Sequence, residues 1–166
     1  MKSNFYYLFF VFALLLAGCN TDNLEESPDT LQLSERSADR PFKVRSAGSF
    51  NVVEPDVCAP LAQIILEGSG NGTHIGLFDV YITWCDDFAG TTIQNGIVTA
   101  ANGDELYFYV TGFGIDDDGE FGEYTFEGGT GRFEDSYGFL KLYNLVEFTG
   151  PGVGTYSNQG EGFINY

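Results

Sequence analysis

Apolar and polar residues alternate along most of the chain after residue 42, and this alternation predicts β-strands. The apolar series are Phe78, Val80, Ile82 and Trp84, then Leu106, Phe108 and Val110, then Tyr124 and Phe126, and finally Leu140 and Leu142. Successive side chains of a strand point to opposite faces, so each series lies on one face. The second face of several strands carries tyrosine or phenylalanine beside polar groups, and no segment after residue 42 shows a convincing helical period.

Turn signals that contain glycine separate the alternating segments at short spacing. Asn102-Gly103 predicts a two-residue type I′ hairpin turn, in which both residues need a positive φ, and Asp118-Gly119 predicts another. Glycines 128, 129 and 131 mark a further turn. About eight short strands joined in this way favour an all-β fold that closes into an antiparallel β-barrel, with a β-sandwich as the alternative.

The N-terminal segment has the pattern of an export signal. An uncharged stretch over residues 5–16 follows Lys2 and is too short to span a bilayer core of about 30 Å. The stretch ends in Leu16-Ala17-Gly18-Cys19, which resembles the lipobox of bacterial lipoproteins. This pattern predicts a signal peptide over residues 1–18, and the resemblance implies a lipid anchor on Cys19. An ordinary secretory signal is the alternative.

The residues after Cys19 bear on location and domain organisation. Residue 20 is Asn20, where an aspartate would suggest retention in the inner membrane of many Gram-negative bacteria. The resemblance therefore implies an outer-membrane lipoprotein, on the periplasmic face or the cell surface. Residues 19–41 are rich in acidic and small polar side chains and predict a flexible tether, which leaves residues 42–166 as the barrel domain.

The net charge of the chain argues against one class of binding partner. The 166 residues include 24 acidic and 7 basic side chains, and the net charge is −17. Nucleic acids bind through clustered lysine and arginine, so this charge argues against a nucleic-acid partner. Apolar residues make up 43% of the chain and aromatic residues 16%, which is far more than a disordered protein contains. We therefore expect a folded domain that reaches the membrane through its lipid anchor.

The three cysteines suggest one disulfide. With Cys19 lipidated, Cys58 and Cys85 remain as a pair in an oxidising compartment, where a disulfide is the expected outcome. The alternative is a metal site or a catalytic thiol, for which two cysteines and one distant histidine are too few groups.

Four phrases resemble small bacterial barrel proteins related to allene oxide cyclase and to plant dirigent proteins. They are Gly72-Thr73-His74-Ile75-Gly76, the hairpin over residues 99–106, Gly128-Gly129-Thr130-Gly131-Arg132-Phe133, and the closing strand over residues 160–166. The resemblance covers residues 58–166 and implies a closed eight-stranded antiparallel barrel. It leaves function open, because related barrels include a cyclase and proteins that guide phenoxy radicals.

Few side chains offer chemistry. His74 is the only histidine, and both a structural role and a role as a base or ligand contact are open. The acidic run at residues 116–120 invites a calcium site, but its spacing is not that of an EF-hand loop, and we interpret it as a solvated hairpin tip. The chain shows no catalytic motif, and we predict no cofactor and no metal.

A barrel of eight strands is just wide enough to be filled by side chains or to hold one small ligand. The candidate ligand-binding residues are His74, Trp84, Phe108, Tyr124 and Phe126. The leading hypothesis is a lipid-anchored envelope barrel without catalytic activity, which binds a small apolar or phenolic molecule or an envelope partner. The alternatives are a cyclase or isomerase that positions its substrate in the barrel, and a structural barrel with no cavity.

Overall fold

The computed structural model describes residues 38–166. The predicted signal peptide over residues 1–18, Cys19 and the tether as far as residue 37 lie outside the described residues. The elements are β1 (Arg40–Val53), β2 (Ala62–Gly72), β3 (Gly76–Asp86), β4 (Thr92–Ala100), β5 (Glu105–Asp116), β6 (Gly119–Gly129), the short 3-10 helix η2 (Gly131–Phe133), β7 (Tyr137–Gly150) and β8 (Val153–Asn165). This part of the chain contains no α-helix.

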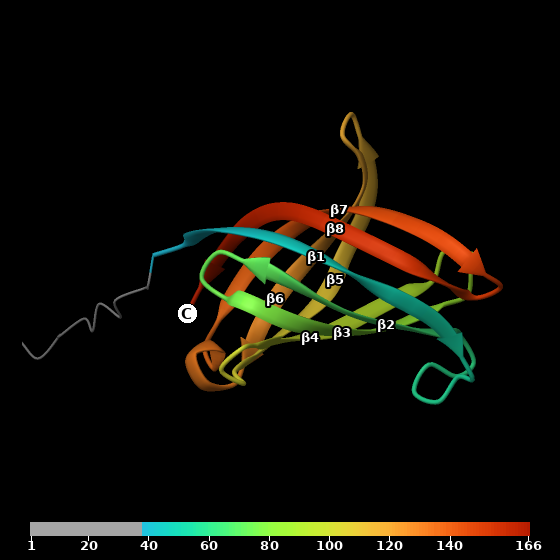
Figure 1. Cartoon of the computed structure of the whole chain (residues 1–166), viewed down its shortest axis with the longest axis horizontal. Coiled ribbons are helices and arrows are strands. Elements are labelled where there is room, and N and C mark those ends of the chain that lie inside the picture. Colours follow the sequence, from blue (N-terminus) through green and yellow to red (C-terminus); the bar gives the residue numbers. More distant parts are fainter. Residues whose placement is uncertain (1–37) are drawn as a thin grey trace, which may run out of the picture. The chain divides into compact units, whose positions relative to one another are not determined.

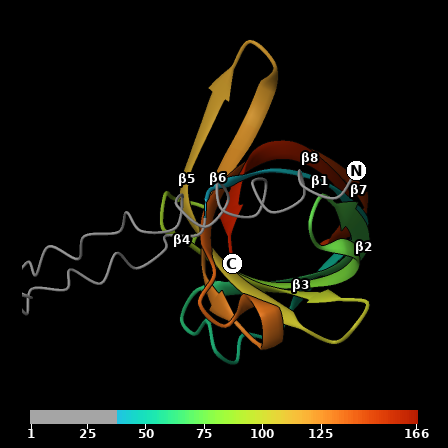
Figure 2. The ribbon, with the colours of Figure 1, turned by 90° about the vertical axis from the view of Figure 1, so that its left-hand side faces the viewer.

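The strands form one closed antiparallel β-barrel, in which each strand pairs with its neighbours in the sequence. β1 closes the ring by pairing with β8 as well as with β2. Figure 2 looks along the barrel and shows this ring. The predicted all-β fold with a closed eight-stranded barrel is therefore confirmed, and the strands do not form the alternative sandwich.

The two ends of the barrel carry different connections. One end, which we call the closed end, holds the start of β1, the β2–β3, β4–β5 and β6–β7 connections, and the end of β8. The other end, which we call the mouth, holds the β1–β2, β3–β4 and β7–β8 connections. In Figure 1 the closed end lies on the left, beside the marked C-terminus, and the mouth lies on the right.

The distal half of the β5–β6 hairpin leaves the barrel wall. β5 pairs with β4 only over residues 105–109, and β6 pairs with β7 only over residues 121–127, whereas the two hairpin strands pair with each other as far as Asp116 and Gly119. Figures 1 and 2 show the hairpin projecting from the ring. Within the described residues, β4 and the distal part of β7 therefore have no strand between them near the mouth.

Apolar side chains fill the half of the barrel next to the closed end. Leu106, Phe133 and Ile164 are completely buried. Phe42 and Phe126 pack edge to face with their ring centroids 5.5 Å apart, a favourable geometry for aromatic pairs. The alternation that the sequence shows in β3 holds in the structure, where Phe78, Val80 and Ile82 all face the core.

A disulfide joins two segments at the mouth. Cys58 lies in the β1–β2 connection and Cys85 near the end of β3, and they are bonded with their Cα atoms 5.2 Å apart. The predicted pairing is confirmed. A bridge between residues 27 positions apart restricts the unfolded chain and stabilises the fold by about 3–4 kcal/mol.

The predicted type I′ turns are wrong in their detail. At residues 102 and 103 only Gly103 has a positive φ, of 90°, and at residues 118 and 119 only Gly119 does. The Gly103 N–H donates a hydrogen bond to the Ala100 carbonyl at 2.8 Å. This is a turn that ends in a left-handed glycine, a common longer form of hairpin loop. The loop is one residue longer than a type I′ turn and contains Asn102, whose polar side chain is described next.

Candidate functional site

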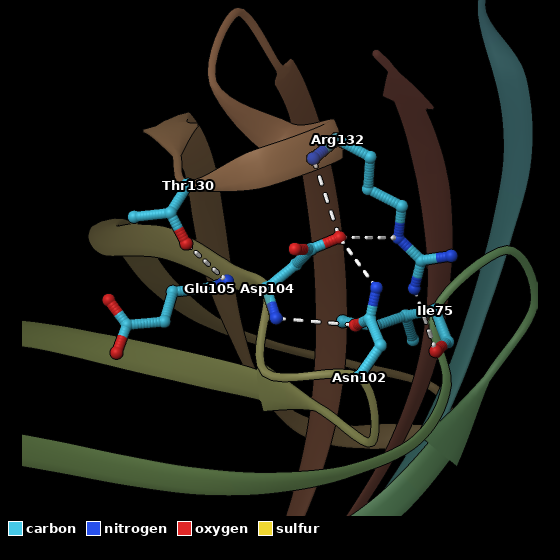
Figure 3. A network of polar contacts seen from close by, with 6 residues as sticks. All are labelled: Ile75, Asn102, Asp104, Glu105, Thr130 and Arg132. Atoms are coloured by element: carbon cyan, nitrogen blue, oxygen red, sulfur yellow. Dashed lines mark hydrogen bonds and ion pairs between the residues drawn. The ribbon is translucent and has the colours of Figure 1, made fainter.

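The phrases that resemble the barrel family meet at the closed end, where Asp104 is the centre of a polar network (Figure 3). Its carboxylate accepts a hydrogen bond from Asn102 Nδ2 at 2.7 Å and lies 3.7 Å from Arg132 Nε. Arg132 Nη2 donates to the Ile75 carbonyl at 3.2 Å. The network therefore ties the β2–β3, β4–β5 and β6–β7 connections together.

η2 and its neighbours cover this end of the barrel. Thr130 Oγ1 accepts a hydrogen bond from the Glu105 backbone N–H at 2.9 Å, which joins η2 to the start of β5. Phe133 inserts its ring into the core and packs against Tyr166 at 5.4 Å between centroids. These phrases thus supply the closure of the barrel at this end.

His74 lies in the β2–β3 connection at the closed end. It is exposed and has a φ of 69°, a left-handed conformation that few residues other than glycine adopt. Its ring is 6.3 Å from that of Tyr166. This position gives His74 a part in the turn and places it away from the cavity described below, so the structure does not join it to the other candidate residues.

Phe108 and Phe126 fill the middle of the barrel. The space left among them and their apolar neighbours is only about 40 Å³. Small-molecule sites usually have about 300 Å³ or more, so this space is too small for a ligand. The ring of Phe108 lies against Gly96, where an added Cβ would come within 2.2 Å of Phe108 Cζ. These two candidate residues therefore contribute to packing.

The mouth half of the barrel contains a cavity of about 440 Å³, which we call the mouth cavity. Its walls include Trp84 and Tyr124, two of the candidate residues, together with Gln94 and Tyr156. Phe113 of the projecting hairpin forms part of one side. The volume lies within the range of about 300–1,000 Å³ that is typical of small-molecule sites. The mouth cavity is therefore the candidate functional site, and a barrel filled throughout is not observed.

A β-bulge directs hairpin side chains towards the mouth cavity. The register between β5 and β6 shifts between Val110 and Gly112. An extra residue in one strand reverses the alternation of faces beyond it. The even-numbered residues of β5 face inward up to Val110, but Phe113 and Ile115 line the cavity. The bulge therefore supplies an apolar wall that regular alternation would have turned outward.

Two tyrosine hydroxyls provide polar groups in these apolar surroundings. Tyr124 Oη donates to Gln94 Oε1 at 3.0 Å. Tyr156 is only 4% exposed, and its hydroxyl has no hydrogen-bond partner among the described residues. Burial raises the pKa of each tyrosine to about 12, so both hydroxyls stay protonated at neutral pH. The unpaired Tyr156 donor costs about 1–3 kcal/mol, and its oxygen is fully buried.

A glycine in β2 makes room for Tyr156. A Cβ atom built on Gly68 would lie 2.5 Å from Tyr156 Oη and 2.4 Å from the Ala47 carbonyl oxygen. Any side chain at residue 68 would therefore displace the tyrosine. Gly68 is one of the positions that set the shape of the mouth cavity.

Trp84 is held at the edge of the mouth cavity by hydrogen bonds. Its Nε1 donates to Asp86 Oδ2 at 2.9 Å and to Thr92 Oγ1 at 2.7 Å. These contacts link β3 to β4 next to the opening in the wall. Because Trp84 is the only tryptophan of the chain, its fluorescence reports directly on the mouth cavity.

Contacts on the outer face of β7 hold the projecting hairpin. Asp116 forms an ion pair with Lys141 and accepts a hydrogen bond from Tyr143 Oη at 3.0 Å. Lys141 Nζ also lies 3.8 Å from the centre of the Phe121 ring, and that ring packs against Tyr143. The hydrogen bond from Lys141 lowers the pKa of Asp116. We call these contacts the hairpin latch.

The hairpin latch adds a contact to the acidic run at residues 116–120. Asp116 is exposed, as predicted for a hairpin tip, and it is also paired with Lys141 and Tyr143, because the hairpin bends over the outside of β7. Between residues 38 and 166, no three histidine, cysteine, aspartate or glutamate side chains are close enough to hold a metal ion together.

Sequence reasoning missed Gln94, Tyr156 and the hairpin residues of the mouth cavity. Tyr156 follows Gly154 and precedes Asn158 on its face of β8, so that face shows no run of apolar residues. Phe113 lies beyond the bulge, which reverses the face that the alternation predicts. The high glycine content of β8 was the available signal, since small residues facing the core leave space for a large ring.

No protein-family model matches the chain, and a search of curated proteins finds no match either. Membership of the barrel family suggested by the four phrases therefore stays a prediction. Among residues 38–166, no helix is long and apolar enough to cross a membrane.

Proposed function

We propose that the barrel domain binds a small, mainly apolar or phenolic molecule in the mouth cavity and does not convert it. The observation that carries the proposal is a cavity of about 440 Å³ whose walls combine Trp84 and Tyr124 with the apolar hairpin residue Phe113. The cavity favours a small molecule over an envelope protein as the partner.

The apolar entrance supports the same proposal. Phe113 and Val146 line the cavity and are each 49% exposed, and Ile115 is 76% exposed. Contiguous exposed apolar surface on a folded domain is typical of a binding site. An apolar molecule seated in the cavity would cover these side chains and gain about 25 cal/mol for each Å² removed from water.

A fluorescent probe tests the proposal. N-phenyl-1-naphthylamine is a small, neutral aromatic amine that absorbs where tryptophan emits. We expect saturable quenching of Trp84 together with increased probe emission, because the bound probe lies beside the indole. An unchanged Trp84 signal up to the solubility limit of the probe would contradict the proposal.

A matched pair of variants tests whether the probe binds in the mouth cavity. Val146→Phe adds volume on the inner face of β7 and should weaken probe binding at least tenfold. Leu145→Phe adds the same kind of ring at the next residue, which does not line the cavity and is 71% exposed, and it should leave binding unchanged. Equal effects of the two substitutions would show that the probe binds elsewhere.

Native mass spectrometry can identify the natural ligand. Protein purified gently from its own host should carry an additional mass of a small molecule, and Val146→Phe should lose it. Extraction and tandem mass spectrometry would then give the chemical class of the ligand.

A cyclase or isomerase is the second candidate function. The observation that favours it is the presence of Asp86 and of two protonated tyrosines in one cavity, where a donor and a carboxylate could act on a positioned substrate. His74 has no part in it, because it lies at the closed end. An isomerase should convert the extracted ligand into an isomer that chromatography separates, whereas a binding protein should return it unchanged.

The cellular address is a separate proposal and rests on residues 1–20 alone. The lipobox-like Leu16-Ala17-Gly18-Cys19 favours a lipid anchor on Cys19 and a place at the outer membrane. Cys19→Ser should release the protein from membranes or leave an uncleaved precursor. Normal cleavage with continued partition into detergent would show that Cys19 is not the anchor.

A further inference from the structure

The charged groups of the mouth cavity are all acidic. Asp86 and Glu120 contribute to its walls, and none of the lining residues is a lysine, arginine or histidine. The connections at the rim add Glu54, Asp56 and Asp87, again without a basic residue. The charged side chains that line the cavity are therefore negative only, and the nearest cation given by the contacts is Lys141, behind the Phe121 ring.

The basic residues of the described chain lie towards the other end. Arg40, Lys43 and Arg45 belong to the first half of β1, Arg132 to η2, and Lys141 to the first half of β7. Both strands start at the closed end. Three of these cations also have acidic partners there or along the wall, namely Glu161 for Lys43, Asp104 for Arg132 and Asp116 for Lys141. The connections at the mouth therefore carry acidic side chains and no basic one, whereas the closed end carries both.

Aromatic faces accompany the negative charge. Trp84, Phe113, Tyr124 and Tyr156 contribute to the cavity, as does Phe121, whose ring is already in contact with Lys141. Aromatic rings attract cations through the negative charge of their faces, and tryptophan does so most strongly. The Trp84 indole donates to Asp86 at 2.9 Å, so a carboxylate and the best such ring are held side by side at the entrance.

We propose that the mouth cavity selects amphiphilic cations, that is, ligands with an apolar body and a positively charged amine or ammonium group, and rejects carboxylic acids of the same size. The apolar body lies against Tyr124 and Ile82, and the cationic group lies at the entrance between Trp84, Asp86 and Glu120. This inference rests on the proposed function, because it concerns the same cavity.

Three probes with the same alkyl chain test the charge selectivity. Decyltrimethylammonium, decanol and decanoate are titrated into the barrel domain at low ionic strength, below the concentrations at which they form micelles, with binding measured by calorimetry and by Trp84 fluorescence. We expect the cation to bind at least tenfold more tightly than decanoate. Its affinity should fall as salt is added, since salt screens charges near the surface.

Two double variants with equal changes of charge provide the control. Asp86→Asn with Glu120→Gln removes both cavity carboxylates and should reduce the preference for the cation to threefold or less. Asparagine keeps one acceptor oxygen for Trp84 and loses the hydrogen bond from the Phe88 N–H, while Thr92 Oγ1 continues to hold the indole. Glu127→Gln with Glu134→Gln makes the same change of net charge at the closed end and should leave the preference intact.

The outcomes separate this inference from the proposed function. If decanoate binds as tightly as decyltrimethylammonium, or if both double variants reduce the preference equally, the inference is overturned while ligand binding stands. If none of the three probes and no N-phenyl-1-naphthylamine binds, the proposed function fails, and the inference fails with it.

Discussion

The closed end and the mouth of this barrel are held together by different interactions. At the closed end, η2 inserts Phe133 into the core, and Asp104 and Arg132 tie three connections together. At the mouth, the β5–β6 hairpin leaves the wall, and the Cys58–Cys85 disulfide joins the β1–β2 connection to β3. One end is closed by packing and hydrogen bonds, and the other stays open and is held by a covalent bond.

This difference indicates that the closed end contributes a packed core and that the mouth contributes space for a ligand. Packing that completes a core leaves no room for a ligand, as the space of about 40 Å³ around Phe108 and Phe126 shows. The mouth cavity of about 440 Å³ exists because two strands withdraw from the wall and Gly68 leaves space for Tyr156. A disulfide can stabilise such a region without filling it. Substitutions at each end test this division separately.

The largest effect should follow the loss of the disulfide. Replacing Cys58 and Cys85 together by alanine should lower the free energy of unfolding by about 3–4 kcal/mol, because the unfolded chain regains the freedom of a loop of this length. Urea denaturation of the mature domain measures the loss. A loss below about 1 kcal/mol would mean that the mouth does not depend on its covalent link.

At the closed end, Gly131→Val should lower the free energy of unfolding by about 2–3 kcal/mol. Gly131 has a φ of 57°, and an added Cβ would lie 2.0 Å from Asp104 Oδ1, so the substitution strains the backbone and displaces the network. Gly90→Val is the control: Gly90 has a φ of 121° but nothing within 4 Å of an added Cβ, and its loss should be smaller. Equal losses would show that the Asp104 network contributes nothing.

Alkaline pH should weaken the fold through the tyrosines of the mouth cavity. Burial raises the pKa of Tyr124 from 10.0 to about 12, so the unfolded chain loses this proton first and stability declines between pH 10 and 12. Below pH 10 this group causes no change. The decline is on the order of 2 kcal/mol for Tyr124 by pH 12.

Urea midpoints between pH 9 and pH 12 measure this decline. Tyr124→Phe removes the group and should show a shallower decline than the unchanged protein. Tyr81→Phe alters an exposed tyrosine and serves as the control. If the stability of Tyr124→Phe declines with pH as steeply as that of the unchanged protein, ionisation of Tyr124 is not the cause of the decline.

The two buried hydroxyls of the mouth cavity should respond in opposite directions. Tyr124→Phe breaks the hydrogen bond to Gln94 and should cost about 1 kcal/mol. Tyr156→Phe removes a buried donor without a partner and should raise the free energy of unfolding by at least about 1 kcal/mol, the lower end of the cost of such a donor. A substantial loss of stability in Tyr156→Phe would show that its hydroxyl has a partner.

His74→Ala should have the smallest effect. The side chain is exposed at the closed end, so we expect a change in the free energy of unfolding within about 0.5 kcal/mol and unchanged probe binding. Thermal unfolding and Trp84 fluorescence measure the two. A loss of binding or of turnover at unchanged stability would contradict the separation of the two ends.

Much of the fold could be predicted from the sequence because its determinants are local. The alternation in β3 and in β5 up to Val110 identifies strands and their inner faces, and glycines at the turns identify hairpins. The candidate site was predicted only in part. Trp84 and Tyr124 lie in the mouth cavity, whereas Phe108 and Phe126 pack the core and His74 lies at the other end.

The all-β fold, the disulfide pair and the aromatic content of the interior follow from the amino-acid sequence alone. Alternation and turn residues act over short distances along the chain, and two remaining cysteines allow only one pairing. Tertiary structure decided which end of the barrel is open. A bulge beyond Val110 turns Phe113 inward, the hairpin latch bends the hairpin over β7, and Gly68 makes room for Tyr156. Each depends on strands that are distant in sequence coming into register, and their packing determines where space remains for a ligand.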